Sequence, residues 1–144
     1  GNYDAIDFPR PMIASNDYNF SFSGIKTSLI YKTKKDPSLL KEENIPDLVA
    51  SFQKASVDVL VEKTFASAKD FNVKNILISG GVAANSLLRS EFLKRADDEK
   101  VNVLIPPLYL CMDNAAMIAS LGYHEYISEN FSIIDFDVYS RSDI

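Results

Sequence analysis

Residues 76–85 read Ile76-Leu-Ile-Ser-Gly-Gly-Val-Ala-Ala-Asn85, and the other segments of the chain are best interpreted around them. A short apolar run ends in two glycines, Gly80 and Gly81, and helical periodicity follows almost at once. A glycine turn admits positive φ and lets another molecule approach the main chain, because glycine has no Cβ. The unpaired N–H groups of the following helix favour an anion such as phosphate. The stretch therefore predicts an anion-binding turn, with a purely structural strand-to-helix connection as the alternative.

The segments on either side of this turn predict a βαβ unit. Residues 75–79 and 101–105 are short apolar runs typical of strands, and residues 83–98 between them have one apolar and one charged helical face. A helix connects the two strands, so they should be parallel with a right-handed crossover. Ligands bind such sheets beyond the carboxyl ends of the strands, where the glycine turn and the loop after Pro107 both lie.

The first half of the chain predicts one short strand and two helices. Residues 20–23 alternate Phe and Ser, which is the period of a strand with one buried face. Helices are expected at residues 25–33 and 47–70. The longer helix is mostly apolar. We interpret its narrow polar stripe, which includes Lys54 and Asp58 at i,i+4, as a solvated face rather than a catalytic carboxylate array.

The last helix, which extends to about residue 129, begins after Cys111-Met-Asp-Asn114. Asp113 or Asn114 is in position to cap it, and we favour capping over metal or substrate binding as the role of Asp113, because caps are abundant. His124 is the single histidine and lies about three turns along this helix. We interpret it as a packing or surface residue, since no second metal ligand is near it in the sequence.

Composition narrows the class of protein. The chain has 144 residues, 47% of them hydrophobic and 24% charged, which fits one domain with a substantial core. A formal net charge of -5 argues against nucleic-acid binding through bulk electrostatics. A local basic patch remains compatible with RNA contact, and the lysine-rich residues 26–41 are either such a patch or a solvated helix end. One cysteine excludes an internal disulfide, and no apolar run approaches the roughly 20 residues of a membrane span, so we expect a cytoplasmic protein without membrane contact.

Three motifs follow one another in this chain: Phe20-Ser-Phe-Ser-Gly-Ile-Lys-Thr27, Gly80-Gly-Val-Ala-Ala-Asn85 and Leu110-Cys-Met-Asp-Asn-Ala-Ala-Met-Ile-Ala119. Together with Phe8-Pro-Arg-Pro-Met12, they resemble the C-terminal portion of the TsaD family of tRNA adenosine threonylcarbamoyltransferases, long labelled glycoproteases or O-sialoglycoprotein endopeptidases. The resemblance implies an α/β fold, namely the second lobe of an actin/Hsp70-like (ASKHA, ribonuclease-H-like) ATPase, helix-rich with a small, partly parallel sheet. Residues 1–144 would then be a single domain, the C-terminal lobe fragment of a longer two-lobed protein.

The resemblance also implies roles for individual residues. Asn85 would contact the adenylate part of ATP or of threonylcarbamoyl-adenylate, and Gly80 and Gly81 would line the same pocket. Asp113 would be a ligand of an iron or zinc ion. No residue of this chain is assigned a catalytic role.

The chain departs from the family pattern at three points. Met112 stands where Thr is usual, and Asn19 stands where an Asp commonly precedes the Phe-Ser-Phe-Ser-Gly motif. The two histidines that complete the family's metal site, spaced His-x-x-x-His, do not occur in this sequence. A lone carboxylate binds a divalent transition metal very weakly, so the chain by itself should lack a competent metal site.

The activity that the resemblance implies is transfer of a threonylcarbamoyl group from threonylcarbamoyl-adenylate to the exocyclic amine of adenosine beside the tRNA anticodon. The metal would orient the acyl donor while Gly80, Gly81 and Asn85 hold AMP as the leaving group. The implied partners are tRNA, a paralogous TsaB-type subunit and a TsaE-type ATPase, and the isolated lobe is expected to be inactive. Two alternatives remain, the nucleotide-binding lobe of an ASKHA small-molecule kinase and a non-catalytic assembly lobe.

Overall fold

The computed structural model describes residues 1–134 of the chain. Contacts divide the chain into two compact units, one from Gly1 to Cys111 and one that begins at Met112. The first unit contains three α-helices and two strands, and the second contains α4 (Ala115–Ile127). This helix-rich composition with a small sheet agrees with the expected α/β class. In the described part of the chain, no helix combines the length and the apolar character that a membrane crossing requires.

Two helices form most of the first half of the chain. α1 spans Ser23–Lys35 and α2 spans Ile45–Asp70. Pro46 lies in the first turn of α2, where its missing N–H costs no intrahelical hydrogen bond. Both predicted helices are confirmed, and each begins two residues before the position that its hydrophobic pattern indicates.

The predicted βαβ unit is confirmed. It consists of β1 (Asn75–Leu77), α3 (Ser86–Glu99) and β2 (Asn102–Leu104). The two strands pair in parallel, with Ile76 opposite Val103. Their carboxyl ends therefore lie at the same edge of the two-stranded sheet, which is the edge where the sequence predicts a ligand.

α3 begins three residues later than predicted. A short 3₁₀-helix, Gly81–Ala84, follows the first glycine of the turn, and Asn85 then provides the N-cap of α3. The backbone next to the glycine pair thus belongs to a tight 3₁₀ turn rather than to the start of the α-helix.

The strand predicted at residues 20–23 is wrong. Residues 20–22 lie outside any strand, and Ser23 is already the first residue of α1. A strand needs a neighbour for its backbone groups, and within residues 1–134 the sheet consists of β1 and β2 alone. The alternation instead reflects packing, because Phe22 contacts a core cluster whereas Phe20 is 45% exposed.

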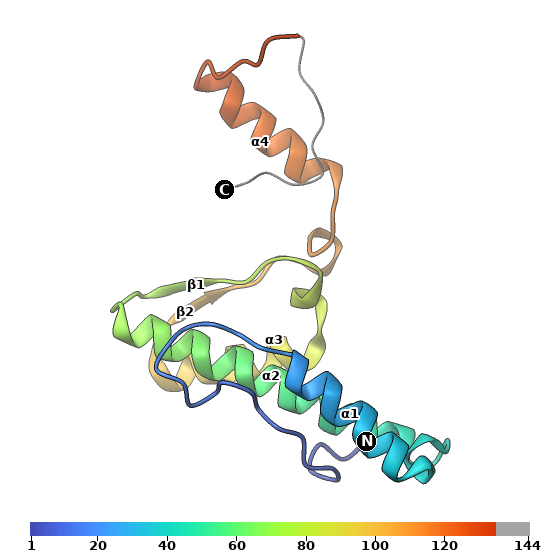
Figure 1. Ribbon diagram of the computed structural model, residues 1–144. Helices are drawn as coiled ribbons and strands as arrows, with labels where there is room; N and C mark the ends of the chain where they lie inside the picture. The colour runs from blue at the N-terminus through green and yellow to red at the C-terminus, as the bar shows by residue number, and fades with distance from the viewer. Residues whose placement is uncertain (135–144) are drawn as a thin grey trace. The chain divides into compact units, whose positions relative to one another are not determined.

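Two hydrophobic clusters stabilise the first unit, and α2 contributes to both. α2 lies beside both α1 and α3 (Figure 1). The cluster between the second half of α2, β1 and α3 has these buried members: Val57, Val61, Phe65, Ala68, Ile76, Leu88, Phe92 and Ala96. The cluster between the N-terminal segment, α1 and the first half of α2 has these: Phe8, Ile25, Leu48 and Ala55. Each fully buried large side chain contributes about 1.5–3 kcal/mol, so α2 is the element on which the unit depends most.

The N-terminal segment covers part of the polar stripe of α2, so the prediction of a solvated face is wrong there. Ser51 is only 2% exposed, and its Oγ donates to the carbonyl oxygen of Asn2 at 3.2 Å. The predicted pair of Lys54 and Asp58 is present. Arg10 reaches the same carboxylate through two guanidinium nitrogens at 2.7 Å each, which ties the N-terminal segment to the helix.

Candidate functional site

The turn after β1 contains two glycines, and the structural reason for glycine at Gly80 does not apply at Gly81. Gly80 has φ 87°, a conformation that side chains with a Cβ rarely adopt, so the backbone itself accounts for glycine at this position. Gly81 does not have positive φ, and a Cβ placed on it would meet no atom of residues 1–134 within 4 Å. Nothing in the described residues requires glycine at position 81, and its main chain is open to an approaching molecule.

The same turn offers backbone hydrogen-bond donors. The N–H of Ala83 donates to the oxygen of Gly80 and that of Asn85 to the oxygen of Val82, at 3.0 Å each, which closes the 3₁₀ turn. The N–H groups of Gly81 and Val82 have no acceptor among residues 1–134. Exposed N–H groups in a concave turn are suited to an anion or to another hydrogen-bond acceptor.

Asn85 lies at the end of this turn and is half-buried. Its Oδ1 accepts a hydrogen bond from the backbone N–H of Leu88 at 3.0 Å, the geometry of an N-cap. The same oxygen accepts a second hydrogen bond, also 3.0 Å, from Nε2 of Gln53 on α2. Gln53 is a residue that the sequence patterns did not single out. The sequence feature that could have indicated it is an amide side chain on an otherwise apolar side of α2, one helical turn from Val49 and from Val57.

A hollow of about 330 Å³ adjoins the glycine turn. Ser79 and Val82 line it from the turn, Leu60 and Thr64 from α2, and Phe20 from the segment before α1. The structure thus brings the Phe-Ser-Phe-Ser motif and the glycine motif to one cavity, although about 60 residues separate them in the sequence.

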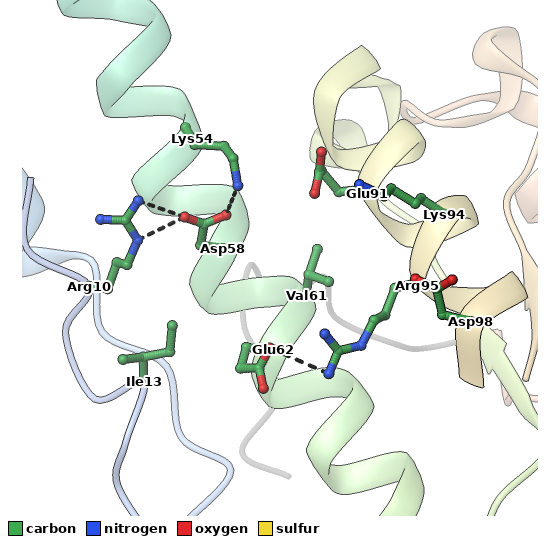
Figure 2. A pocket seen from close by; sticks show the side chains of 10 residues that line it. All are labelled: Arg10, Ile13, Lys54, Asp58, Val61, Glu62, Glu91, Lys94, Arg95 and Asp98. Atoms are coloured by element: carbon green, nitrogen blue, oxygen red, sulfur yellow. Dashed lines mark hydrogen bonds and ion pairs between the residues drawn. The ribbon is translucent and has the colours of Figure 1, made fainter. Parts of the chain in front are cut away.

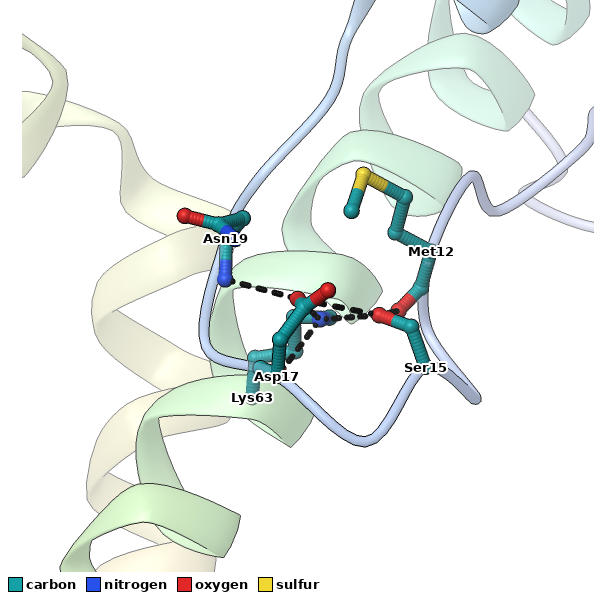
Figure 3. Close-up of polar contacts among 5 residues, drawn as sticks. All are labelled: Met12, Ser15, Asp17, Asn19 and Lys63. Atoms are coloured by element: carbon teal, nitrogen blue, oxygen red, sulfur yellow. Dashed lines mark hydrogen bonds and ion pairs between the residues drawn. The ribbon is translucent and has the colours of Figure 1, made fainter.

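A buried lysine holds the segment that leads to Phe20 (Figure 3). Lys63 on α2 is 3% exposed, and its Nζ donates to Ser15 Oγ at 2.7 Å and to the Asp17 carbonyl and carboxylate oxygens at 2.8 and 3.1 Å. The Asp17 carboxylate also accepts from the N–H of Asn19 at 2.9 Å. These hydrogen bonds hold the pKa of Asp17 below its ordinary value of 3.8, and the bond from Lys63 has the largest effect.

A second hollow, of about 370 Å³, lies between residues 10–13, α2 and α3 (Figure 2). Its charged residues are four bases and four acids: Arg10, Lys54, Lys94 and Arg95, and Asp58, Glu62, Glu91 and Asp98. Arg10 and Lys54 share Asp58, and Arg95 pairs with Glu62 at 3.6 Å. Because the charges compensate one another locally, this hollow lacks the excess of positive charge that an anion site needs.

Asp113 lies in the second unit and is not the cap of α4, so the favoured role for this residue is wrong. α4 begins at Ala115, and its N-cap is Asn114, whose Oδ1 accepts from the N–H of Met117 at 3.1 Å. The Asp113 side chain is exposed and makes no hydrogen bond or ion pair with the described residues. Its carboxylate therefore has no structural task in this part of the chain.

The ligands present do not by themselves fit a transition-metal site. Among residues 1–134, no group of three or more His, Cys, Asp or Glu side chains is placed to hold an ion. His124 is exposed on α4, as predicted, with its ring against that of Tyr123. Asp113 therefore offers one carboxylate, whereas such metals collect three or more protein ligands.

The three residues expected to bind nucleotide, Gly80, Gly81 and Asn85, lie together in the first unit, whereas Asp113 belongs to the second. Within the first unit, the site is thus a glycine turn with free N–H groups, an asparagine fixed at the start of α3, and an adjoining cavity.

The family model and the curated relatives that match this chain carry the same description. Residues 1–120 match the family described as TsaD: tRNA N6-adenosine threonylcarbamoyltransferase. A curated relative of that name from Thermosipho africanus is 51% identical over 128 residues, which are 88% of this chain and 38% of the relative. One from Thermosipho melanesiensis is 49% identical over 123 residues (85% and 37%), and one from Fervidobacterium nodosum is 46% identical over 140 residues (95% and 41%). The chain spans about two fifths of the length of these relatives.

Proposed function

The chain belongs to the TsaD family, and on that premise we propose that it is part of a tRNA N6-adenosine threonylcarbamoyltransferase, as the second lobe of a two-lobed ASKHA fold. In the proposed reaction, the exocyclic nitrogen of adenosine beside the tRNA anticodon attacks the carbamoyl carbon of threonylcarbamoyl-adenylate. A carbon–nitrogen bond forms, the bond from that carbon to the phosphate oxygen breaks, and the nitrogen loses a proton. AMP leaves with the electron pair of the broken bond.

In this reaction the lobe holds the AMP part of the donor. The free N–H groups of Gly81 and Val82 are suited to the phosphate, whose negative charge grows as AMP leaves. Asn85 supplies a side-chain contact at the end of the same turn. The observation that carries the proposal is the open space at Gly81. No described residue requires glycine there, whereas the close approach of a ligand to the main chain does.

Gly81→Ala tests this proposal in the intact protein. We expect the fold to tolerate the added methyl group, which meets no atom within 4 Å, while AMP affinity and tRNA modification fall because the methyl group occupies the approach to the main chain. Calorimetric titration with AMP and a tRNA modification assay measure the two effects.

Gly122→Ala is the matched control, since a Cβ at this position of α4 also meets no atom of the described part of the chain within 4 Å. It should leave AMP affinity unchanged. Wild-type AMP affinity in both Gly81→Ala and the bulkier Gly81→Val would remove the glycine turn from the binding site and favour a non-catalytic assembly lobe.

We also propose that Asp113 contributes one ligand to an iron or zinc site whose other ligands lie outside this chain. The support is that Asn114, rather than Asp113, caps α4, which leaves the Asp113 carboxylate available. tRNA, a TsaB-type subunit and a TsaE-type ATPase are the proposed partners of the whole protein, following from membership of the family.

A further inference from the structure

The orientation of the Asn85 side chain follows from its two neighbours. A backbone N–H can only donate, so the Asn85 atom that faces the N–H of Leu88 must be the amide oxygen. Gln53 faces the same oxygen at 3.0 Å and must therefore turn its own amide nitrogen toward it. Each contact fixes the assignment of the next, so the Asn85 amide has one orientation.

This orientation determines what Asn85 offers a ligand. Two hydrogen bonds occupy its oxygen, whereas its nitrogen makes no hydrogen bond with the described residues. The nitrogen of an amide carries two donors and accepts nothing, so the group left for a ligand selects acceptor atoms. On an adenylate these are the phosphate and ribose oxygens and the ring nitrogens of adenine.

Gln53 adds a constraint that the cap alone does not supply. The bond from Leu88 fixes the Asn85 oxygen relative to α3, because both residues belong to the start of that helix. The bond from Gln53 crosses 32 positions of sequence and fixes it relative to α2, the helix that carries both core clusters. The two bonds together hold the Asn85 side chain in place between the two helices.

We propose that Gln53 is a positioning residue, which holds Asn85 so that its amide nitrogen alone faces the adenylate as a hydrogen-bond donor. This inference rests on the proposed function, which supplies the identity of the ligand. Gln53 itself acts on the ligand through Asn85.

The polarity of Asn85 is tested with Asn85→Asp and Asn85→Ala in the intact protein. Asp is as good an N-cap as Asn and still accepts from Gln53, but it has no donor for the ligand. We expect unchanged thermal stability and at least a roughly tenfold loss of AMP affinity for Asn85→Asp. If Asn85→Ala weakens AMP binding and Asn85→Asp does not, the donor assignment is overturned while the proposed function stands. If neither variant alters AMP binding, the proposed function itself fails at this residue.

The role of Gln53 is tested with Gln53→Leu, which keeps the size of the side chain and removes the donor. AMP affinity should fall roughly three- to tenfold, the effect of one net hydrogen bond. The KM for threonylcarbamoyl-adenylate should rise while kcat changes little. In the Asn85→Ala background, Gln53→Leu should have no further effect, because its partner is gone.

Ser56→Ala is the control on α2, since its Oγ donates only to the carbonyl oxygen of Phe52 within the helix. It should leave AMP affinity unchanged. The inference is overturned if Gln53→Leu lowers AMP affinity equally in the wild-type and Asn85→Ala backgrounds. It is also overturned if Gln53→Leu leaves AMP affinity unchanged in the wild-type background. If a thermal melt shows that the Gln53→Leu variant does not fold, Gln53→Met takes its place, and its effect is again compared between the wild-type and Asn85→Ala backgrounds.

Discussion

At the scale of single residues, Lys63 is the buried charge that holds the segment before Phe20 in place. Its ammonium group donates to Ser15 and Asp17 across 46 to 48 positions of sequence. A buried ammonium group needs such partners, because burial removes its hydration. The segment that it holds leads directly to Phe20, which lines the cavity beside the glycine turn.

Replacement of this lysine should destabilise the first unit. Lys63→Met keeps the length of the side chain and removes three hydrogen bonds, so we expect a loss of about 1–3 kcal/mol in the free energy of unfolding. Urea denaturation of the wild type and the variant measures it. Lys69→Met, an exposed lysine on the same helix, is the control and should change stability little. Equal stability of the Lys63 and Lys69 variants would contradict a structural role for the buried ammonium group.

The same interaction predicts a dependence on pH. The pKa of Asp17 is lowered in the folded protein, chiefly by the hydrogen bond from Lys63, so its ionised form stabilises the fold above the ordinary value of 3.8. That contribution is lost as the pH falls through the lowered pKa. Thermal melts between about pH 7 and pH 3 should therefore show a loss of stability in the wild type that is smaller in Lys63→Met.

At the scale of elements, asparagine side chains begin both α3 and α4. Asn85 accepts from the N–H of Leu88 and Asn114 from that of Met117, each three residues along the chain. In both cases one group near the cap makes no hydrogen bond with the described residues, namely the amide nitrogen of Asn85 and the carboxylate of Asp113. The start of each helix thus combines a structural residue with a candidate ligand group.

Substitutions at the start of α4 should separate these tasks. Asn114→Ala should destabilise the first turn of α4 by about 1 kcal/mol, because it removes the cap. The helix content measured by circular dichroism should fall. Asp113→Ala should leave helicity unchanged and reduce the metal content of the intact protein, measured by elemental analysis. Asp97→Ala, an exposed carboxylate of α3, is the control for metal content. Unchanged metal content in Asp113→Ala would exclude this residue as a ligand.

At the scale of the whole molecule, the formal net charge of -5 requires that any RNA contact be local. The last turn of α1 carries three lysines, Lys32, Lys34 and Lys35. Lysines at a helix C-terminus also stabilise the helix through its dipole, which explains them without RNA. Lys32 in addition lies over the ring of Phe8, with 5.8 Å between its Nζ and the ring centroid, so it has a packing role as well.

Charge reversal distinguishes the two explanations. Lys34→Glu with Lys35→Glu should weaken tRNA binding by the intact protein and flatten its salt dependence, by about 0.9 in the log–log slope for each duplex phosphate that the protein no longer neutralises. The same double reversal at Lys69 and Lys74, both exposed, changes the net charge equally and should leave the slope unchanged. Equal slopes in the two double variants would assign the lysines of α1 to helix stability alone.

The local elements of this protein are properties of its sequence. Hydrophobic periodicity sufficed for α1, α2 and the parallel βαβ unit, because each pattern repeats over neighbouring residues. The glycine motif likewise located the turn where Gly80 adopts positive φ, since few other residues tolerate it. The ordered motifs also indicated the family that the comparison with relatives shows.

The tertiary structure alone determined which polar groups meet. The Phe-Ser alternation resembled a strand, yet within residues 1–134 no neighbouring strand pairs with it, and strand formation depends on such a partner. Ser51 and Lys63 are buried because a segment more than 40 residues earlier covers them. Gln53 reaches Asn85 across 32 positions. The sequence thus located the glycine turn, and contacts between distant segments decided how its asparagine is held, since hydrogen bonds join groups that folding brings together.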